Sequence, residues 1–151
     1  MEYPLISHCI NLLKNRIEAM TGSDGTPVFQ EVRGIVMSSP ANLWELVPEL
    51  SFFPCAVITS GLARPLDYGA TREVEIAVIV IDEFRTDSEN LSGYDLIDRT
   101  FSELSPPLPG APLKLENINY VWQSTTPVEL IDSQHTAWNI TFAAKMSFVN
   151  N

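Results

Sequence analysis

The sequence contains few basic residues and few charged residues of any kind. Nine lysines and arginines stand against nineteen acidic residues among 151, which gives a formal net charge of -10. A surface this acidic repels phosphate groups, which argues against specific binding of DNA or RNA. Charged residues make up only 19% of the chain. This low share predicts that a partner protein covers part of the surface.

Long apolar runs are also missing. No stretch approaches the roughly 20 apolar residues that a membrane-spanning helix needs. The chain starts with Met-Glu-Tyr-Pro, without the basic segment that opens a secretory signal peptide. We therefore expect no membrane contact and a protein made and used in a cytoplasm.

Cysteine and histidine are too sparse for an obvious metal site. The two cysteines, Cys9 and Cys55, have apolar neighbours and are expected to be buried free thiols, although a disulfide stays open at this point. The two histidines, His8 and His135, are far apart in the sequence, and no second Cys or His lies at zinc-ligand spacing. The sequence predicts no bound metal.

Motifs for catalysis are missing as well. The chain has no phosphate-binding glycine loop and no dinucleotide-binding glycine motif. Ser60-Gly61 follows an apolar segment but lacks the Gly-x-Ser-x-Gly frame of a nucleophile elbow. We therefore predict that the chain is not an enzyme, with no catalytic residue and no cofactor. The densest acidic group does not follow a calcium-loop pattern; it consists of Asp82, Glu83, Asp87 and Glu89.

The hydrophobic pattern predicts one α+β domain that spans residues 1–151. Apolar residues recur at helical spacing in residues 4–20 and 92–104. Strand patterns cover residues 27–37, 54–60, 72–84, 114–123, 126–132 and 136–149. The order is α-β-β-β-α-β-β-β. Runs of strands favour a mixed or mostly antiparallel sheet with the two helices packed on one face.

The strand at 72–84 allows two interpretations. One of its faces is apolar throughout, whereas the other begins with Glu73 and Glu75 and then becomes apolar. Such a strand is either central in the sheet or an exposed edge that joins the sheet of a neighbouring subunit.

Residues 61–71 contain glycine and proline and are expected to form a loop. Arginine and tyrosine are favoured anchors of protein interfaces. The loop and the following strand start therefore supply a candidate interface with another subunit or with a partner, although an ordinary exposed loop fits too. The candidate residues are Arg64, Leu66, Asp67, Tyr68 and Arg72.

Taken together, these segments resemble the small phage tail terminator and tail completion proteins of the Mu-type minor tail group. The resemblance covers about residues 5–148 and depends on the amphipathic first helix and on five further segments. These are Phe-Pro-Cys-Ala-Val-Ile (53–58), Glu-Val-Glu-Ile-Ala-Val-Ile-Val (73–80), Tyr-Asp-Leu-Ile-Asp-Arg (94–99), Pro-Val-Glu-Leu-Ile-Asp (127–132) and Ala-Trp-Asn-Ile-Thr-Phe (137–142).

The resemblance implies a structural virion protein. Such proteins form a ring, usually a hexamer, at the head-proximal end of the tail tube, where the ring ends tube polymerisation and offers the head-joining surface. The implied partners are further copies of the chain, the tail tube protein and a head-completion protein, with DNA passing through the lumen. The implied locations are the virion tail and, during assembly, the host cytoplasm. The family supplies no catalytic residues to transfer.

Six copies of the chain would carry a total charge of about -60, and an acidic lumen would limit the sticking of DNA. The lumen candidates are Asp82, Glu83, Asp87 and Glu89. Two other functions stay open. One is a head-completion or neck connector protein, which would bind the portal. The other is a small ligand-binding or enzymatic α+β domain.

Overall fold

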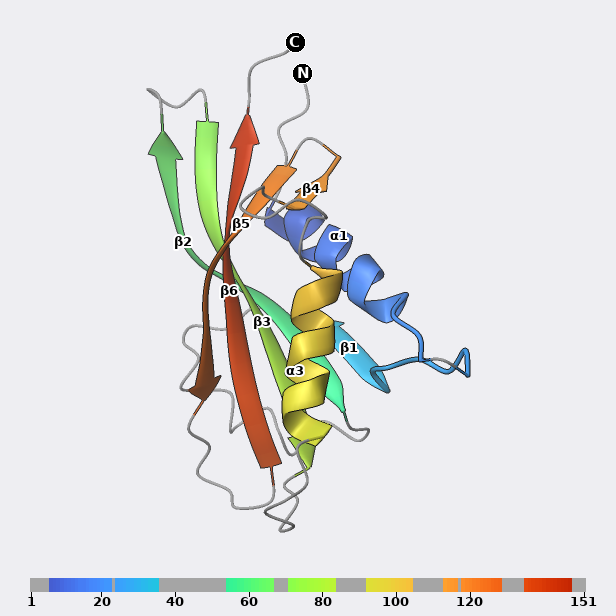
Figure 1. Ribbon diagram of the computed structural model, residues 1–151. Helices are drawn as coiled ribbons and strands as arrows, with labels where there is room; N and C mark the ends of the chain where they lie inside the picture. Colours follow the sequence, from blue (N-terminus) through green and yellow to red (C-terminus); the bar gives the residue numbers. More distant parts are fainter. Residues whose placement is uncertain are drawn as a thin grey trace.

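The computed structural model describes residues 6–22, 24–35, 54–66, 71–83, 92–104, 113–116, 118–128 and 135–147. It contains two main helices and a six-stranded mixed sheet (Figure 1). The predicted α+β class and the order α-β-β-β-α-β-β-β are confirmed. Neither of these helices is long and apolar enough to cross a membrane.

The sheet has the strand order β1-β2-β3-β6-β5-β4. β1 and β2 are parallel, and the other neighbouring pairs are antiparallel. The strands are β1 Glu31–Gly34, β2 Cys55–Leu66, β3 Thr71–Glu83, β4 Leu113–Leu115, β5 Ile118–Val128 and β6 His135–Ser147.

Helix α1, Ile6–Glu18, packs one apolar stripe on the sheet. Its residues Cys9, Ile10, Leu13 and Ile17 are buried, at the three- and four-residue spacing that places side chains on one face of a helix. The helix crosses β1 closely at Gly34, where a Cβ atom would lie 2.9 Å from Cγ2 of Ile10. Glycine at this position therefore sets how near α1 approaches the sheet.

Helix α3, Ser92–Glu103, lies on the same face of the sheet as α1 (Figure 1). Leu96 and Ile97 are buried in the same core cluster as the stripe of α1. Thr100 is also buried, and its hydroxyl donates a 2.7 Å hydrogen bond to the Leu96 carbonyl, which removes the cost of an unpaired polar group. The predicted packing of both helices on one face is confirmed.

Strand β3 lies in the middle of the sheet. It pairs with β2 on one side and, over its whole length, with β6 on the other. The interpretation of this segment as an exposed edge strand was therefore wrong, and its long apolar stretch is explained by a central position.

The sheet buries apolar residues on both faces. Alternate β3 residues such as Val78 face the helices, whereas Ile79 and Ile81 point to the other face. The second cluster is buried within the single chain. Its members are Cys55, Val57, Ala77, Ile79, Ile81 and Ala137, each at most 5% exposed. Cys9 belongs to the helix-facing cluster and Cys55 to this one, and both are buried free thiols as predicted.

Four predicted strand boundaries were wrong. The strand predicted at 114–123 is divided, because Leu113–Leu115 forms β4 and pairs antiparallel with the start of β5. Among the described residues of the predicted strand 27–37, which end at Ile35, the strand covers Glu31–Gly34. The preceding residues close a turn after α1, with the Val28 amide donating to the Met20 carbonyl. The predicted break between residues 123 and 126 is a β-bulge inside one strand, β5, where the register shifts between Trp122 and Ser124. The strand predicted at 54–60 continues to Leu66 as β2.

Candidate functional site

The predicted interface loop is mostly strand. Residues 61–66 belong to β2 and Thr71 starts β3, so the loop prediction was wrong for these residues, whereas residues 67–70 lie outside the described part of the chain. Gly61 lies at a register shift between Ser60 and Ala63, and Pro65 lies where β1 no longer pairs with β2. A bulge and an outer edge are the places where a strand tolerates glycine and proline.

The interface candidates are spread along this hairpin. Arg64 pairs with Glu73, and Leu66 pairs with Thr71, in the backbone register of β2 and β3. Asp67 and Tyr68 lie outside the described residues. Arg72 is half-buried on the helix-bearing side of β3, close enough to Cys9 to favour its thiolate. Arg72 is therefore placed under α1, and its position differs from that of an exposed anchor.

The acidic candidates lie at the other end of β3. Asp82 is half-buried and pairs with Thr136, and Glu83 pairs with His135. Ten residues separate Arg72 from Asp82, which corresponds to about 33 Å along a strand. Asp87 and Glu89 lie outside the described residues. The described members of the predicted interface set and of the predicted lumen set thus lie toward opposite ends of the sheet.

The structure adds a surface that the sequence interpretation missed, on β5. Trp122 is 51% exposed and Val121 is 36% exposed. The Trp122 ring contacts Phe101 of α3 edge to face, with ring centroids 5.1 Å apart and an angle of 73° between the rings. Its indole N–H donates a 3.0 Å hydrogen bond to the Thr125 hydroxyl. An exposed tryptophan held in one orientation is typical of a protein contact.

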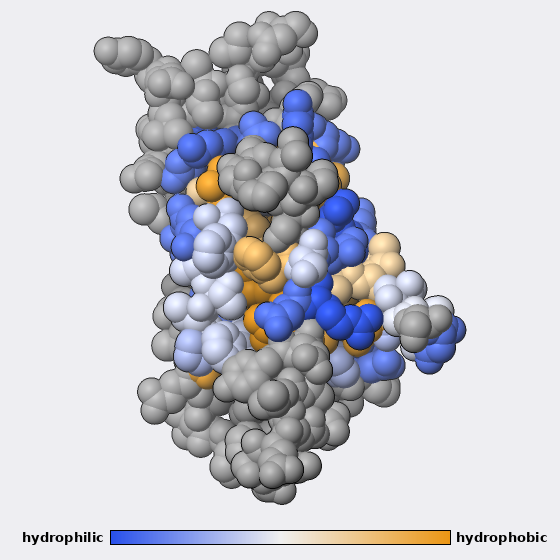
Figure 2. Space-filling model, viewed as in Figure 1, coloured by the Kyte–Doolittle hydropathy of each residue, from blue (hydrophilic) through white to orange (hydrophobic). Residues whose placement is uncertain are grey.

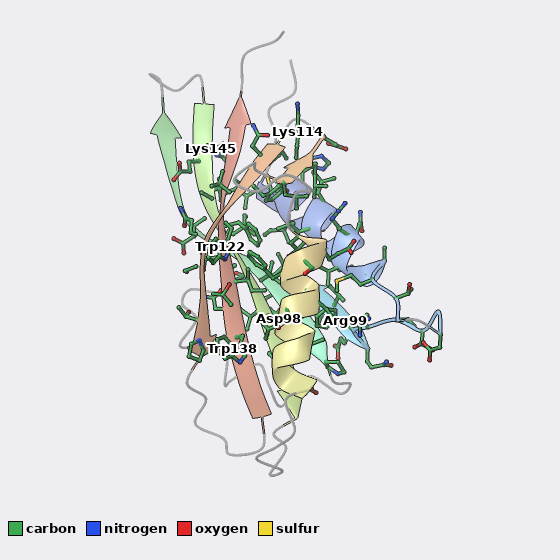
Figure 3. The ribbon with its side chains drawn as sticks, in the orientation of Figure 1. Asp98, Arg99, Lys114, Trp122, Trp138 and Lys145 are labelled. Carbon is green, nitrogen blue, oxygen red and sulfur yellow. The ribbon has the colours of Figure 1, made fainter. Side chains whose placement is uncertain are left out.

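β5 and most of β6 carry no charged residues. Residues 118–128 of β5 and 136–144 of β6 contain no Asp, Glu, Lys or Arg. In this view the molecular surface over β5 is mostly pale (Figure 2). Lys114 and Lys145 lie near one end of the sheet, away from Trp122 in the middle of β5 (Figure 3).

The sequence contained a signal for this surface. The uncharged run of residues 118–128 includes a tryptophan and is visible in the sequence. Because a break was predicted at 124–125, the run was divided between two strands and the exposed surface was not recognised.

Both long strands near the sheet edges carry features that oppose edge-to-edge pairing. β2 has a register shift after Ser60 and carries Pro65, and β5 has a register shift after Trp122 and carries Pro127. Bulges and prolines are the common means by which proteins stop an edge strand from accepting another strand. Contacts made by these edges are therefore expected to involve side chains more than a continued hydrogen-bond ladder.

One shallow cleft lies between α3 and the end of α1. It has a volume of about 340 Å³ and contains an apolar floor with a polar rim from α3. Its lining residues are Met20, Thr21, Val28, Asp98, Arg99, Ser102 and Glu103. Figure 3 shows Asp98 and Arg99 on α3. Within the described ranges, no three His, Cys, Asp or Glu side chains are placed to share a metal ion.

Ion pairs between the helices and other segments are exposed. His8 of α1 contacts Glu116 after β4, with 2.7 Å between Nε2 and Oε2. Arg16 donates a 3.1 Å hydrogen bond to the Glu103 carbonyl at the end of α3. Exposed pairs of this kind contribute at most about 1 kcal/mol each. They position the helices but give no catalytic arrangement.

Comparison with known proteins finds no protein-family model and no curated protein that matches this chain.

Proposed function

We propose that this chain is a structural assembly protein that caps the head-proximal end of a phage tail tube as a ring. In that role it ends tube polymerisation and presents the surface that joins the head. The observation that carries the proposal is the exposed Trp122 on β5, a strand without charged residues. A surface poor in charge and containing an aromatic anchor suits a lasting contact with another protein.

The electrostatics of the chain support the same role. A formal charge of -10 per copy disfavours adhesion to DNA. A passage for the genome requires such weak adhesion. Asp82 and Glu83 at one end of β3 are candidates for the wall of that passage. The hairpin with Arg64 and Leu66 at the other end is a candidate for the tube-facing or neighbour-facing surface.

The proposal is tested on tail tubes from the phage or prophage that encodes the chain. Purified protein is added to polymerising tube protein, and tube lengths are measured by negative-stain microscopy. Addition in slight excess over tube ends is expected to stop growth and to leave extra density at one end. Unchanged tube lengths, without bound protein, would contradict the proposal.

The same experiment separates the capping role from the neck-connector alternative. A connector binds purified portal or filled heads and leaves tube growth unchanged, whereas a cap binds the tube end without a head. Charge reversal at Glu83 is expected to slow DNA ejection in assembled particles while ring formation is preserved. Normal ejection by particles that carry Glu83→Lys would remove Glu83 from the lumen wall.

A further inference from the structure

A row of register partners crosses the face of the sheet opposite the helices. Lys114 of β4 pairs with Asn119 of β5, and Asn119 pairs in turn with Lys145 of β6. On its other side, Lys145 faces Glu73 of β3. Each of the four has a chain neighbour in the helix-facing core, and these neighbours are Leu113, Ile118, Ala144 and Val74. Because side chains alternate between the two faces of a strand, the row lies on the opposite face.

The two lysines of this row are exposed and unpaired. Neither Lys114 nor Lys145 forms an ion pair with another residue in the described part of the chain. They are two strands apart, which separates their Cα atoms by about 10 Å. Figure 3 shows both at the same end of the sheet. The chain has only nine lysines and arginines, so two unpaired cations in one row concentrate its positive charge.

The carboxylates of neighbouring positions are engaged elsewhere. β4, β5 and β6 contain no Asp or Glu. Glu116 follows β4, and its Oε2 atom lies 2.7 Å from Nε2 of His8 on α1. Oε1 of Glu75 lies 2.8 Å from the place that a Cβ atom on Gly61 would occupy, so this carboxylate is directed toward β2 and away from β6. Glu73 is half-buried and, within the described residues, forms no ion pair with its register partner on β6. This face is therefore acidic over β3 and basic across β4, β5 and β6.

Charge decides which partner suits the basic side of this face. A nucleic acid would extend beyond the two lysines over acidic parts of the chain, where its phosphates are repelled. A second copy, at -10, would bring the same repulsion between the remaining surfaces. A short acidic segment of another protein needs only the two cations, each of which forms a charge-assisted hydrogen bond with a carboxylate. Val121, which is 36% exposed and pairs with Ala143 one row away on the same face, adds an apolar contact.

We propose that Lys114 and Lys145, with Asn119 between them, bind an acidic segment of another protein through its carboxylates. The two ammonium groups contact the carboxylates, and Val121 contacts an apolar side chain of the same segment. Trp122 contacts α3 on the helix-bearing face, so this surface is separate from the exposed tryptophan. The inference goes beyond the capping function and does not depend on it, because it requires only a partner with an acidic segment.

The test uses a short fluorescein-labelled oligoglutamate peptide as the probe. The peptide is titrated with the full chain at low ionic strength, and binding is followed by fluorescence anisotropy. The test variant combines Lys114→Gln with Lys145→Gln. The matched control combines Lys14→Gln with Arg99→Gln on the two helices, which gives the same net charge and leaves the row intact. Circular dichroism and thermal melting establish that each variant is folded.

We expect the wild-type protein to bind the peptide, with an affinity that falls as the salt concentration rises. The test variant is expected to weaken binding by roughly fivefold or more, and the control by less than about twofold. Replacement of both lysines by arginine keeps the charges and is expected to preserve binding. The peptide should shift the backbone amide NMR signals of Lys114, Asn119 and Lys145 more than those of the helices.

Any of four results would overturn the inference. Absence of peptide binding by the wild-type protein, or equal binding by the test and control variants, would show that the lysine row is not the docking surface. Tighter binding of duplex DNA than of the peptide, lost in the test variant, would assign the row to phosphate groups. Self-association that is lost in the test variant alone would make a second copy the occupant. Tube capping is measured separately by tube length, so each of these results leaves that function standing.

Discussion

Alkaline pH is expected to destabilise this protein through its two buried thiols. Burial raises the pKa of the Cys9 thiol to about 11, despite the opposing effect of Arg72. Burial raises the pKa of the Cys55 thiol to about 12, assisted by the nearby charges of Glu31 and Asp82. In the unfolded chain both thiols are exposed and lose their protons near pH 9.

The sign of the effect follows from proton counting. Above pH 9 the unfolded chain has released protons that the native protein retains, so raising the pH favours unfolding. The stabilisation is complete below pH 9 and is lost as pH rises toward the native pKa values of Cys9 and Cys55. Each thiol contributes a loss of about 1.4 kcal/mol at pH 10, or about 3 kcal/mol for the pair.

The assay is urea denaturation followed by circular dichroism at several pH values between 7.5 and 10. The matched control is the Cys9→Ala, Cys55→Ala double variant, which has lower stability throughout because it leaves small cavities. Its free energy of unfolding should fall less steeply with pH than that of the wild-type protein, because the variant lacks both thiols. The titration of tyrosine and lysine is common to both proteins and cancels in the comparison. Parallel pH profiles for the two proteins would refute the reasoning, because they would require both thiols to titrate normally in the native state.

Three further substitutions test the packing, each by urea denaturation. Gly34→Ala should destabilise the protein by about 1–3 kcal/mol, because the new methyl group would meet Ile10 at 2.9 Å; an unchanged midpoint would mean that α1 moves away freely. Tyr120→Phe should cost about 0.5–1.5 kcal/mol, because the buried hydroxyl donates a 2.7 Å hydrogen bond to the Cys9 carbonyl; no loss would show that this bond contributes nothing. Ile79→Ala should cost about 2–5 kcal/mol, because this side chain is fully buried on the face opposite the helices; a cost near zero would contradict a second packed face.

Much of the fold could be predicted because its periodic segments agree with their tertiary positions. The apolar stripe of the first helix and the strand predicted at 136–149 were found as α1 and β6, since each packs an apolar face against the core. The central position of β3 was one of two interpretations, and pairing on both sides decided between them. Strand order could not be predicted, because it depends on which edges meet in space.

The errors arose where glycine and proline lie inside strands. Gly61 and Pro65 were interpreted as loop residues, yet both lie within β2. Gly61 lies at the bulge, and Pro65 lies beyond the part of β2 that pairs with β1. The bulge after Trp122 divided β5 in the same way, and the exposed surface was missed with it. Local patterns report the backbone preference of a residue, but they do not show whether a neighbouring strand needs its N–H group. That information exists only in the assembled sheet.

The central claim is that this chain closes a tail tube through contacts between its own copies. Cryo-electron microscopy of tail tubes incubated with the protein tests that claim most directly. We predict a closed ring of the chain at one end of each tube. Bare tube ends with wild-type protein at saturating concentration would contradict the account.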